Sequence, residues 1–226
     1  MKTSDKILLF LLFPLMVAAL YMAFLYAPQE RVMGVVQRIF YFHVSSAWCG
    51  LLAFLFVFIG GAMYLWTKKV KWDHFAHASA EMGVLFCTIV LITGPIWARP
   101  VWNVWWTWDP RLTSTFILWL IFVAYLILRS SLRVSPGIRT YASVYGILGF
   151  VDVPIVYMSI YWWRTMHPRV ITPEKVDLDP RMWISVLFCF MTMLLLMTVL
   201  MRLRIQIERA REQVQFLQEK IQEDNL

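Results

Sequence analysis

Charged residues are scarce in this sequence, which argues against a soluble protein. Asp, Glu, Lys and Arg make up 15% of the 226 residues and hydrophobic residues make up 60%, whereas soluble domains usually carry about 25% charged residues. Cysteine is also rare, because Cys49, Cys87 and Cys189 are the only three and no Cys-x-x-Cys pair occurs. The sequence therefore offers no dithiol exchange site, no cysteine-type zinc site and no c-type haem attachment motif.

Long apolar runs occupy most of the chain. A bilayer core about 30 Å thick needs roughly 20 apolar residues per helix, and the sequence predicts an all-α, polytopic integral membrane protein with six transmembrane helices. They are placed at about 7–27, 44–66, 75–97, 113–131, 141–163 and 182–201. The first run is too long for a signal peptide and lacks a small-residue cleavage site after it, so we expect a retained helix.

The distribution of Lys and Arg predicts the orientation. With the amino terminus inside, the cytoplasmic segments hold 13 of these residues and the opposite segments hold 8, and cytoplasmic loops are enriched in them. Both termini are therefore predicted to be cytoplasmic, with outer-face loops at 28–43, 98–112 and 164–181. We attribute the net charge of +7 to the basic residues that set the membrane topology and contact anionic lipid. No nucleic-acid motif accompanies it.

The second predicted outer loop is unusually rich in tryptophan. An aromatic belt at the membrane surface explains one or two indoles per helix end, but this density favours a platform for a flat, mostly apolar ligand with an anionic rim. Arg99 and Arg111 are suited to that rim as bidentate donors, whereas Asp109 is better explained as a cap of the next helix or a partner of Arg111. The indoles belong to Trp102, Trp105, Trp106 and Trp108.

The sequence contains four histidines, and two of them fall on the predicted outer side. His43 and His167 each lie near a helix end at that face. Either alone is as well explained by interfacial hydrogen bonding, but a pair beside a tryptophan platform is better explained as axial ligands of haem iron. His74 and His77 are predicted to form hydrogen bonds at the cytoplasmic end of the third helix, because no Cys or acidic cluster completes a zinc site.

Two acidic residues fall within predicted spans, where an ionisable group is a functional hypothesis by default. We expect structural roles instead. Glu81 lies near the cytoplasmic end, within reach of Arg or Lys. Asp152 precedes Pro154, which frees a backbone carbonyl, so a protonated Asp152 has a hydrogen-bond partner locally or on a neighbouring helix.

The carboxyl-terminal segment, 202–226, is predicted to be a cytoplasmic amphipathic helical tail that follows the domain at 1–201. Its apolar residues recur with alternating spacings of four and three over fewer than three heptads. An extension of the sixth helix that docks on a partner is therefore favoured over an independent coiled coil. The apolar positions are Leu203, Ile207, Ala210, Val214, Leu217 and Ile221.

Three stretches together resemble one family. The pattern W-x-x-W-W-x-W-D-x-R-L-T, from Trp102 to Thr113, resembles the tryptophan-rich WWD signature of haem-handling proteins of cytochrome c assembly. RIFYFHVSSAW and VDVPIVYMSIYWWRTMHP, which carry the two outer histidines, are similar to segments of the haem exporter protein C family, CcmC. The sequence departs from the pattern in having Asn103 and Ala98 where we expect glycine and Pro110 where we expect a small residue.

The resemblance implies a haem-binding and transfer protein that is not an enzyme. Such a protein holds haem b (iron protoporphyrin IX) at the periplasmic face of the bacterial inner membrane and loads it onto the chaperone CcmE, together with CcmD and the ABC-transporter subunits CcmA and CcmB. His43 and His167 would be the axial ligands, with the four loop indoles, Asp109 and Arg111 as the platform. A cytochrome c haem lyase or synthase, a haem transporter and a structural subunit are the alternatives.

Overall fold

The computed structural model describes residues 3–131, 135–167 and 178–224, and this part of the chain is helical without β-strands. Six helical segments are long and apolar enough to cross a membrane, which confirms the predicted all-α, six-span fold. The fifth span is divided between two helices. The elements are α1 (Thr3–Tyr21) with a π-helical turn (Met22–Tyr26), a 3-10 turn (Val35–Gln37), α2 (Arg38–Thr67), α3 (Val70–Trp102), α4 (Pro110–Ser131), α5 (Pro136–Phe150), α6 (Asp152–Trp162) and α7 (Pro180–Asp224).

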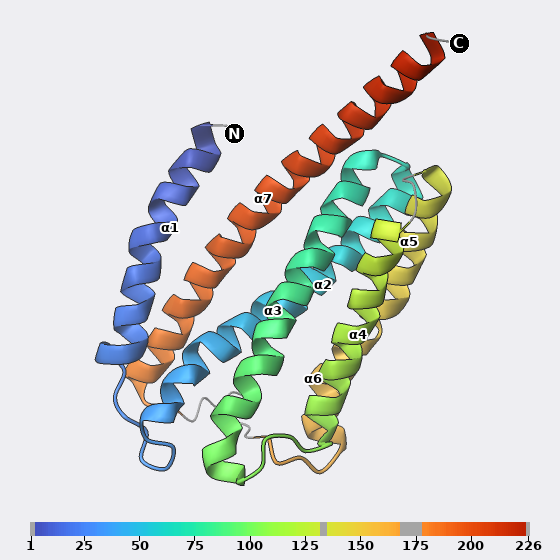
Figure 1. Cartoon of the computed structure of the whole chain (residues 1–226). Coiled ribbons are helices and arrows are strands. Elements are labelled where there is room, and N and C mark those ends of the chain that lie inside the picture. Colours follow the sequence, from blue (N-terminus) through green and yellow to red (C-terminus); the bar gives the residue numbers. More distant parts are fainter. Residues whose placement is uncertain (1–2, 132–134, 168–177, 225–226) are drawn as a thin grey trace.

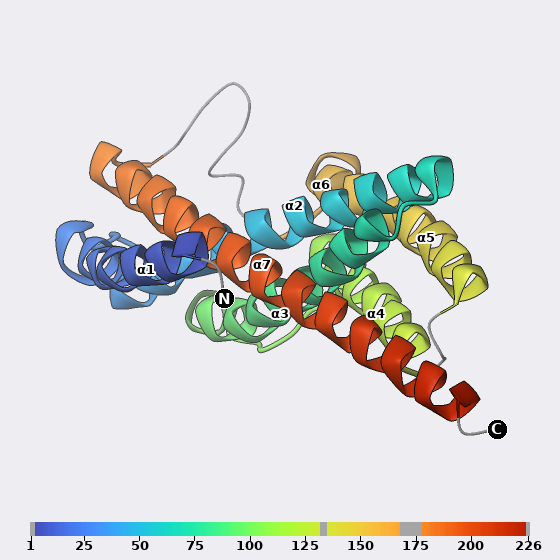
Figure 2. The same ribbon diagram turned by 90° about the horizontal axis from the view of Figure 1, so that it is seen from above.

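The helices form one bundle with two distinct ends (Figure 1). Both ends of the chain lie at one end, here called the terminal end. The segments 27–37, 103–109 and 163–167 lie at the opposite end, here called the loop end. Helix α2 packs against α3, α5 and α7, and the view from above shows α7 running across the bundle and projecting beyond it (Figure 2).

Helices extend further into two of the predicted outer loops than the sequence suggested. Helix α2 begins at Arg38, so His43 is helical, and α3 continues to Trp102. Asn103 ends α3 with φ 57°, and its N–H donates to the Arg99 carbonyl at 3.0 Å. Glycine and asparagine favour this left-handed conformation after a helix, so Asn103 serves where the family pattern suggested glycine. The third predicted loop lies partly outside the described residues.

Close approach of α2 and α3 depends on small residues, as is usual where transmembrane helices pack. A Cβ on Gly83 would lie 2.3 Å from Cε1 of Phe54. The Phe54 ring in turn stacks on Phe122 of α4, with 4.0 Å between the ring centroids. These contacts fill the middle of the bundle with apolar side chains.

Ion pairs hold the terminal end together. Asp73 of α3 and Arg129 of α4 form two hydrogen bonds of 3.0 and 2.9 Å, and both side chains are 1% exposed. Glu81 pairs with Arg204 of α7, which confirms the expectation that a basic residue lies in its reach. His74 lies 3.0 Å from Glu212, also on α7, so the carboxyl-terminal helix docks on its own bundle.

The predicted tail is continuous with the sixth span, and its first half uses polar residues to contact the bundle. The apolar seam faces elsewhere: Ile207 is 55% exposed, Val214 53% and Leu217 56%. The expected partner of Asp152 is not found, because Oδ2 of this residue is buried and has no hydrogen-bond partner among the described residues. Asp152 begins α6 just after the break in the fifth span.

Candidate functional site

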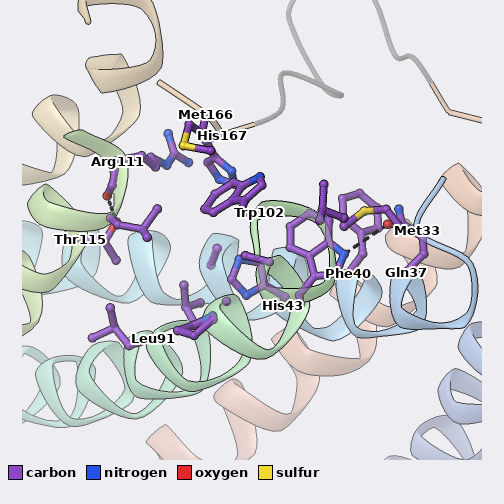
Figure 3. A pocket seen from close by; sticks show the side chains of 18 of the residues that line it. Met33, Gln37, Phe40, His43, Leu91, Trp102, Arg111, Thr115, Met166 and His167 are labelled. Carbon is purple, nitrogen blue, oxygen red and sulfur yellow. Dashed lines mark hydrogen bonds between the residues drawn. The ribbon is translucent and has the colours of Figure 1, made fainter. Parts of the chain in front are cut away.

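A cavity of about 820 Å³ lies at the loop end of the bundle. Helices α2, α3 and α4 form its apolar walls, and the loops 28–33 and 166–167 contribute to its rim. Its volume is within the range of ligand pockets, about 300–1,000 Å³. His43 and His167 both line this cavity, and they face it from different elements of the fold (Figure 3).

His43 is buried on α2 and is held by side chains of α3. Its Nδ1 lies 2.9 Å from Oγ1 of Thr93, and its ring centroid lies 5.5 Å from that of Trp97. The indole N–H of Trp97 donates to Oε1 of Gln37 at 3.3 Å. Trp97 is therefore a packed support for His43 rather than part of an open platform.

His167 lies in the segment that follows α6, outside the membrane-spanning helices. Burial, and then the nearby Arg111 guanidinium, lowers the pKa of His167 from 6.5 to about 4. The imidazole is therefore neutral at physiological pH, which is the form that binds metals. Its Nδ1 is buried and has no hydrogen-bond partner in the described part of the chain. Buried polar atoms in proteins usually have a partner, so this nitrogen is available to a bound ligand.

Asp109 joins two segments of the loop end. Its carboxylate accepts a hydrogen bond of 2.9 Å from the Arg111 N–H, which caps α4 as expected. It also accepts bonds of 2.9 Å from Oγ1 of Thr165 and 2.8 Å from the N–H of Met166. Oγ1 of Thr165 in turn accepts a bond of 3.0 Å from the His167 N–H. Asp109 is not among the residues that line the cavity, so it positions the His167 segment from behind.

A second Asp-Pro-Arg sequence shows what is special about Asp109. Asp179 begins α7 in the same way, accepting a bond of 2.8 Å from the Arg181 N–H. The capping function thus explains both sequences, whereas the contacts of Asp109 with the loop after α6 arise only from the tertiary fold.

The two arginines proposed for an anionic rim have different positions. Arg111 lines the cavity, and its Nη1 donates to the Val156 carbonyl of α6 at 3.0 Å. Arg99 is not among the lining residues; its Nη1 donates to Oδ1 of Asn103 at 2.5 Å, and its guanidinium lies 5.8 Å from the Trp105 ring centroid. Arg111 is therefore the cation of this pair that a ligand in the cavity would meet.

The four loop indoles separate into two pairs. Trp102 and Trp106 line the cavity, while Trp105 and Trp108 are not among its lining residues and are 61% and 73% exposed. The Trp106 and Trp108 rings meet edge to face, with 5.8 Å between their centroids. One pair can contact a bound ligand and the other presents an aromatic outer surface.

Sequence reasoning missed several residues of the site. Thr93 and Gln37 support His43 and Trp97 across a helix interface, and Met166 lines the cavity next to His167. Met166 was detectable as the neighbour of a candidate ligand. Thr93 and Gln37 carry no such signal, because their role depends on how α2 and α3 pack.

These observations define a class: a polytopic helical membrane protein with a two-histidine, indole-lined cavity at one end of the bundle. The family model described as "Heme exporter protein C" (CcmC) matches residues 2–218. The chain belongs to this family.

Individual relatives agree with that assignment. A "Putative cytochrome c biosynthesis ccmC-like mitochondrial protein" of Marchantia polymorpha is 32% identical over 76% of this chain and 73% of its own length. A protein of the same description from Arabidopsis thaliana is 33% identical over 80% of this chain and 69% of its own length. "Heme exporter protein C" of Escherichia coli (strain K12) is 34% identical over 70% of this chain and 64% of its own length.

Proposed function

We propose that this protein binds haem b at the periplasmic face of the bacterial inner membrane and delivers it to the chaperone CcmE during c-type cytochrome maturation. The observation that carries the proposal is that His43 and His167, from separate elements, line one cavity of about 820 Å³. Iron porphyrins commonly take imidazole as an axial ligand. A role in cytochrome c maturation also agrees with the descriptions of the two plant relatives.

The residues present fit haem. His43 and His167 would hold the iron, and the neutral state of His167 and its unsatisfied Nδ1 suit a ligand site. Trp102 and Trp106 offer flat apolar contact, and the guanidinium of Arg111 has donors beyond its bond to Val156 for a carboxylate group. Haem supplies the iron and the vinyl groups; this chain binds, orients and shields it.

The membrane orientation in this proposal follows from charge. More Lys and Arg belong to the terminal end and its connecting loops than to the loop end, so the terminal end is assigned to the cytoplasm and the cavity to the periplasm. CcmD and the ABC-type subunits CcmA and CcmB are proposed partners on the basis of family membership.

Delivery requires a surface where the chaperone can approach the bound haem. Trp105 and Trp108 are exposed beside the cavity, and tryptophan is enriched where proteins meet. We assign these two indoles to contact with CcmE. Substituting both by alanine is expected to leave haem binding unchanged and to slow transfer of haem to purified CcmE.

Retention of haem at one end is favoured over its passage through the bundle. Phe54 lies at the floor of the cavity and stacks on Phe122, and the buried Asp73–Arg129 pair lies further toward the terminal end. A carboxylate-bearing ligand would have to cross this apolar packing. The proposal is therefore binding and handover without a chemical step by this chain.

The test is the absorption spectrum of the protein purified in detergent from haem-replete cells. His43→Ala and His167→Ala are each expected to weaken and shift the Soret band, because each removes one axial ligand. His74→Ala, at the terminal end, is the control for loss of a buried histidine and should keep the wild-type band. A wild-type spectrum in either loop-end variant would refute the proposal.

A further inference from the structure

We propose that Thr93 is a positioning residue that fixes the tautomer of His43, so that Nε2 keeps the lone pair with which the imidazole binds iron. This inference rests on the proposed haem function and extends it to a residue outside the cavity lining. It follows from three hydrogen-bond partners that α2 and α3 bring together, with His43 seen at the cavity wall in Figure 3.

The hydroxyl of Thr93 has one hydrogen and two neighbours. Its Oγ1 lies 2.7 Å from the Ile89 carbonyl oxygen, one helical turn earlier, and 2.9 Å from Nδ1 of His43. Two oxygens at 2.7 Å repel each other unless a hydrogen lies between them, and this distance is typical of an O–H···O bond. The hydroxyl hydrogen is therefore directed at the Ile89 carbonyl.

The oxygen of Thr93 is then an acceptor toward His43. Nδ1 of His43 must carry the proton and donate it, and in a neutral imidazole the other nitrogen, Nε2, is left unprotonated. Histidine ligands of metals commonly donate the second ring N–H to a fixed acceptor, which sets the tautomer and the ring orientation. Thr93 supplies that acceptor from within the same helix pair.

Two further residues of α3 limit how the His43 ring can turn. A Cβ on Gly94 would lie 3.3 Å from Cε1 of His43, so the absence of a side chain there lets the ring rest against the helix. The Trp97 ring lies on the same helix at 5.5 Å between centroids. Hydrogen bond and contacts thus select one orientation of the imidazole.

The chain contains a matched control for a Thr93 substitution. Thr88, on the same helix, donates to the Val84 carbonyl at 2.7 Å and accepts from Nε1 of Trp119 at 2.8 Å. It has the same arrangement as Thr93, with an indole in place of the imidazole, and it is not among the cavity-lining residues. Thr88→Val therefore removes an equivalent hydroxyl without touching a histidine.

The first measurement uses the wild-type, haem-free protein in detergent micelles. Nitrogen-15 NMR of labelled histidine, with the His43 resonance assigned by comparison with His43→Gln, should show Nδ1 protonated and Nε2 unprotonated. The opposite tautomer would overturn the inference, and this result does not depend on haem binding or on whether any Thr93 variant folds.

The second measurement is haem titration of Thr93→Val, Thr93→Ser and Thr88→Val. Loss of an outer partner of a metal ligand usually lowers metal affinity about 10–100-fold, so Thr93→Val is expected to bind haem that much more weakly and to show a mixture of His43 tautomers. Thr93→Ser should restore the haem affinity and the single His43 tautomer, and Thr88→Val should resemble the wild-type protein in both properties. Unchanged tautomer and affinity in Thr93→Val would refute the role of Thr93.

Haem binding by His43 and its positioning by Thr93 are tested separately. If His43→Ala retains the wild-type Soret band, the haem proposal fails whatever Thr93 does. If His43→Ala loses the band and Thr93→Val does not change the His43 tautomer, His43 is a ligand and Thr93 does not position it.

Discussion

Removing the Asp109 carboxylate should release the His167 segment from the site. Asp109→Ala deletes the acceptor of two bonds to the loop after α6, those from Thr165 at 2.9 Å and Met166 at 2.8 Å. It also removes the cap of α4. Asp109 is 7% exposed, so water has little access to the donors that would lose this carboxylate.

The expected loss of haem affinity follows from the two hydrogen bonds that Thr165 and Met166 donate to Asp109. Hydrogen bonds to charged groups contribute roughly 1.5–3 kcal/mol each, which gives about 3 kcal/mol at the lower end for the pair. Since 1.4 kcal/mol corresponds to a factor of ten in binding, haem affinity should fall about 100-fold if His167 binds only in the docked segment. His43 would remain as a single axial ligand, and the spectrum should report that change.

The assay is haem titration by Soret absorbance, with Ser135→Ala as the control for loss of a helix cap. Ser135 caps α5 at 3.3 Å from the Ile138 N–H and lies outside the cavity lining. In the His167→Ala background, Asp109→Ala should add little further loss, because both changes act on one ligand. A full additional loss in the double variant would show that Asp109 acts on haem independently of His167.

Two other predictions concern the protonation of the site and the stability of the terminal end. Burial lowers the pKa of His167 to about 4. The His167 imidazole is therefore protonated near pH 6.5 in the unfolded chain, but only near pH 4 in the folded chain. The segment therefore loses stability as pH falls from about 6.5 to about 4 and is unaffected above; an NMR titration midpoint near 6.5 would contradict this. Asp73→Leu leaves Arg129 buried without its carboxylate and should destabilise the protein in detergent by about 3–5 kcal/mol. Adding Arg129→Met should recover most of that loss in thermal unfolding.

The amino-acid sequence alone determined the class and the fold. Apolar runs of membrane-crossing length can be identified directly from the sequence, because every helix that crosses a bilayer needs one. The sequence also indicated both histidines and the tryptophan-rich segment, since these residue types are chemically distinctive. The helix ends predicted from the sequence were less accurate than the number of helices. The third span was predicted to end at residue 97, whereas α3 continues to Trp102 and ends at the left-handed backbone conformation of Asn103.

Tertiary structure alone decided which of these residues share a site. Nothing in the spacing of the sequence separates Trp102 and Trp106, which line the cavity, from Trp105 and Trp108, which are exposed and do not line it. The bond between Thr93 and His43 joins residues 50 positions apart, and Asp109 reaches Met166 across 57. Side-chain type is a local property of the chain, whereas a hydrogen bond between helices exists only once packing has fixed their rotation and depth relative to each other.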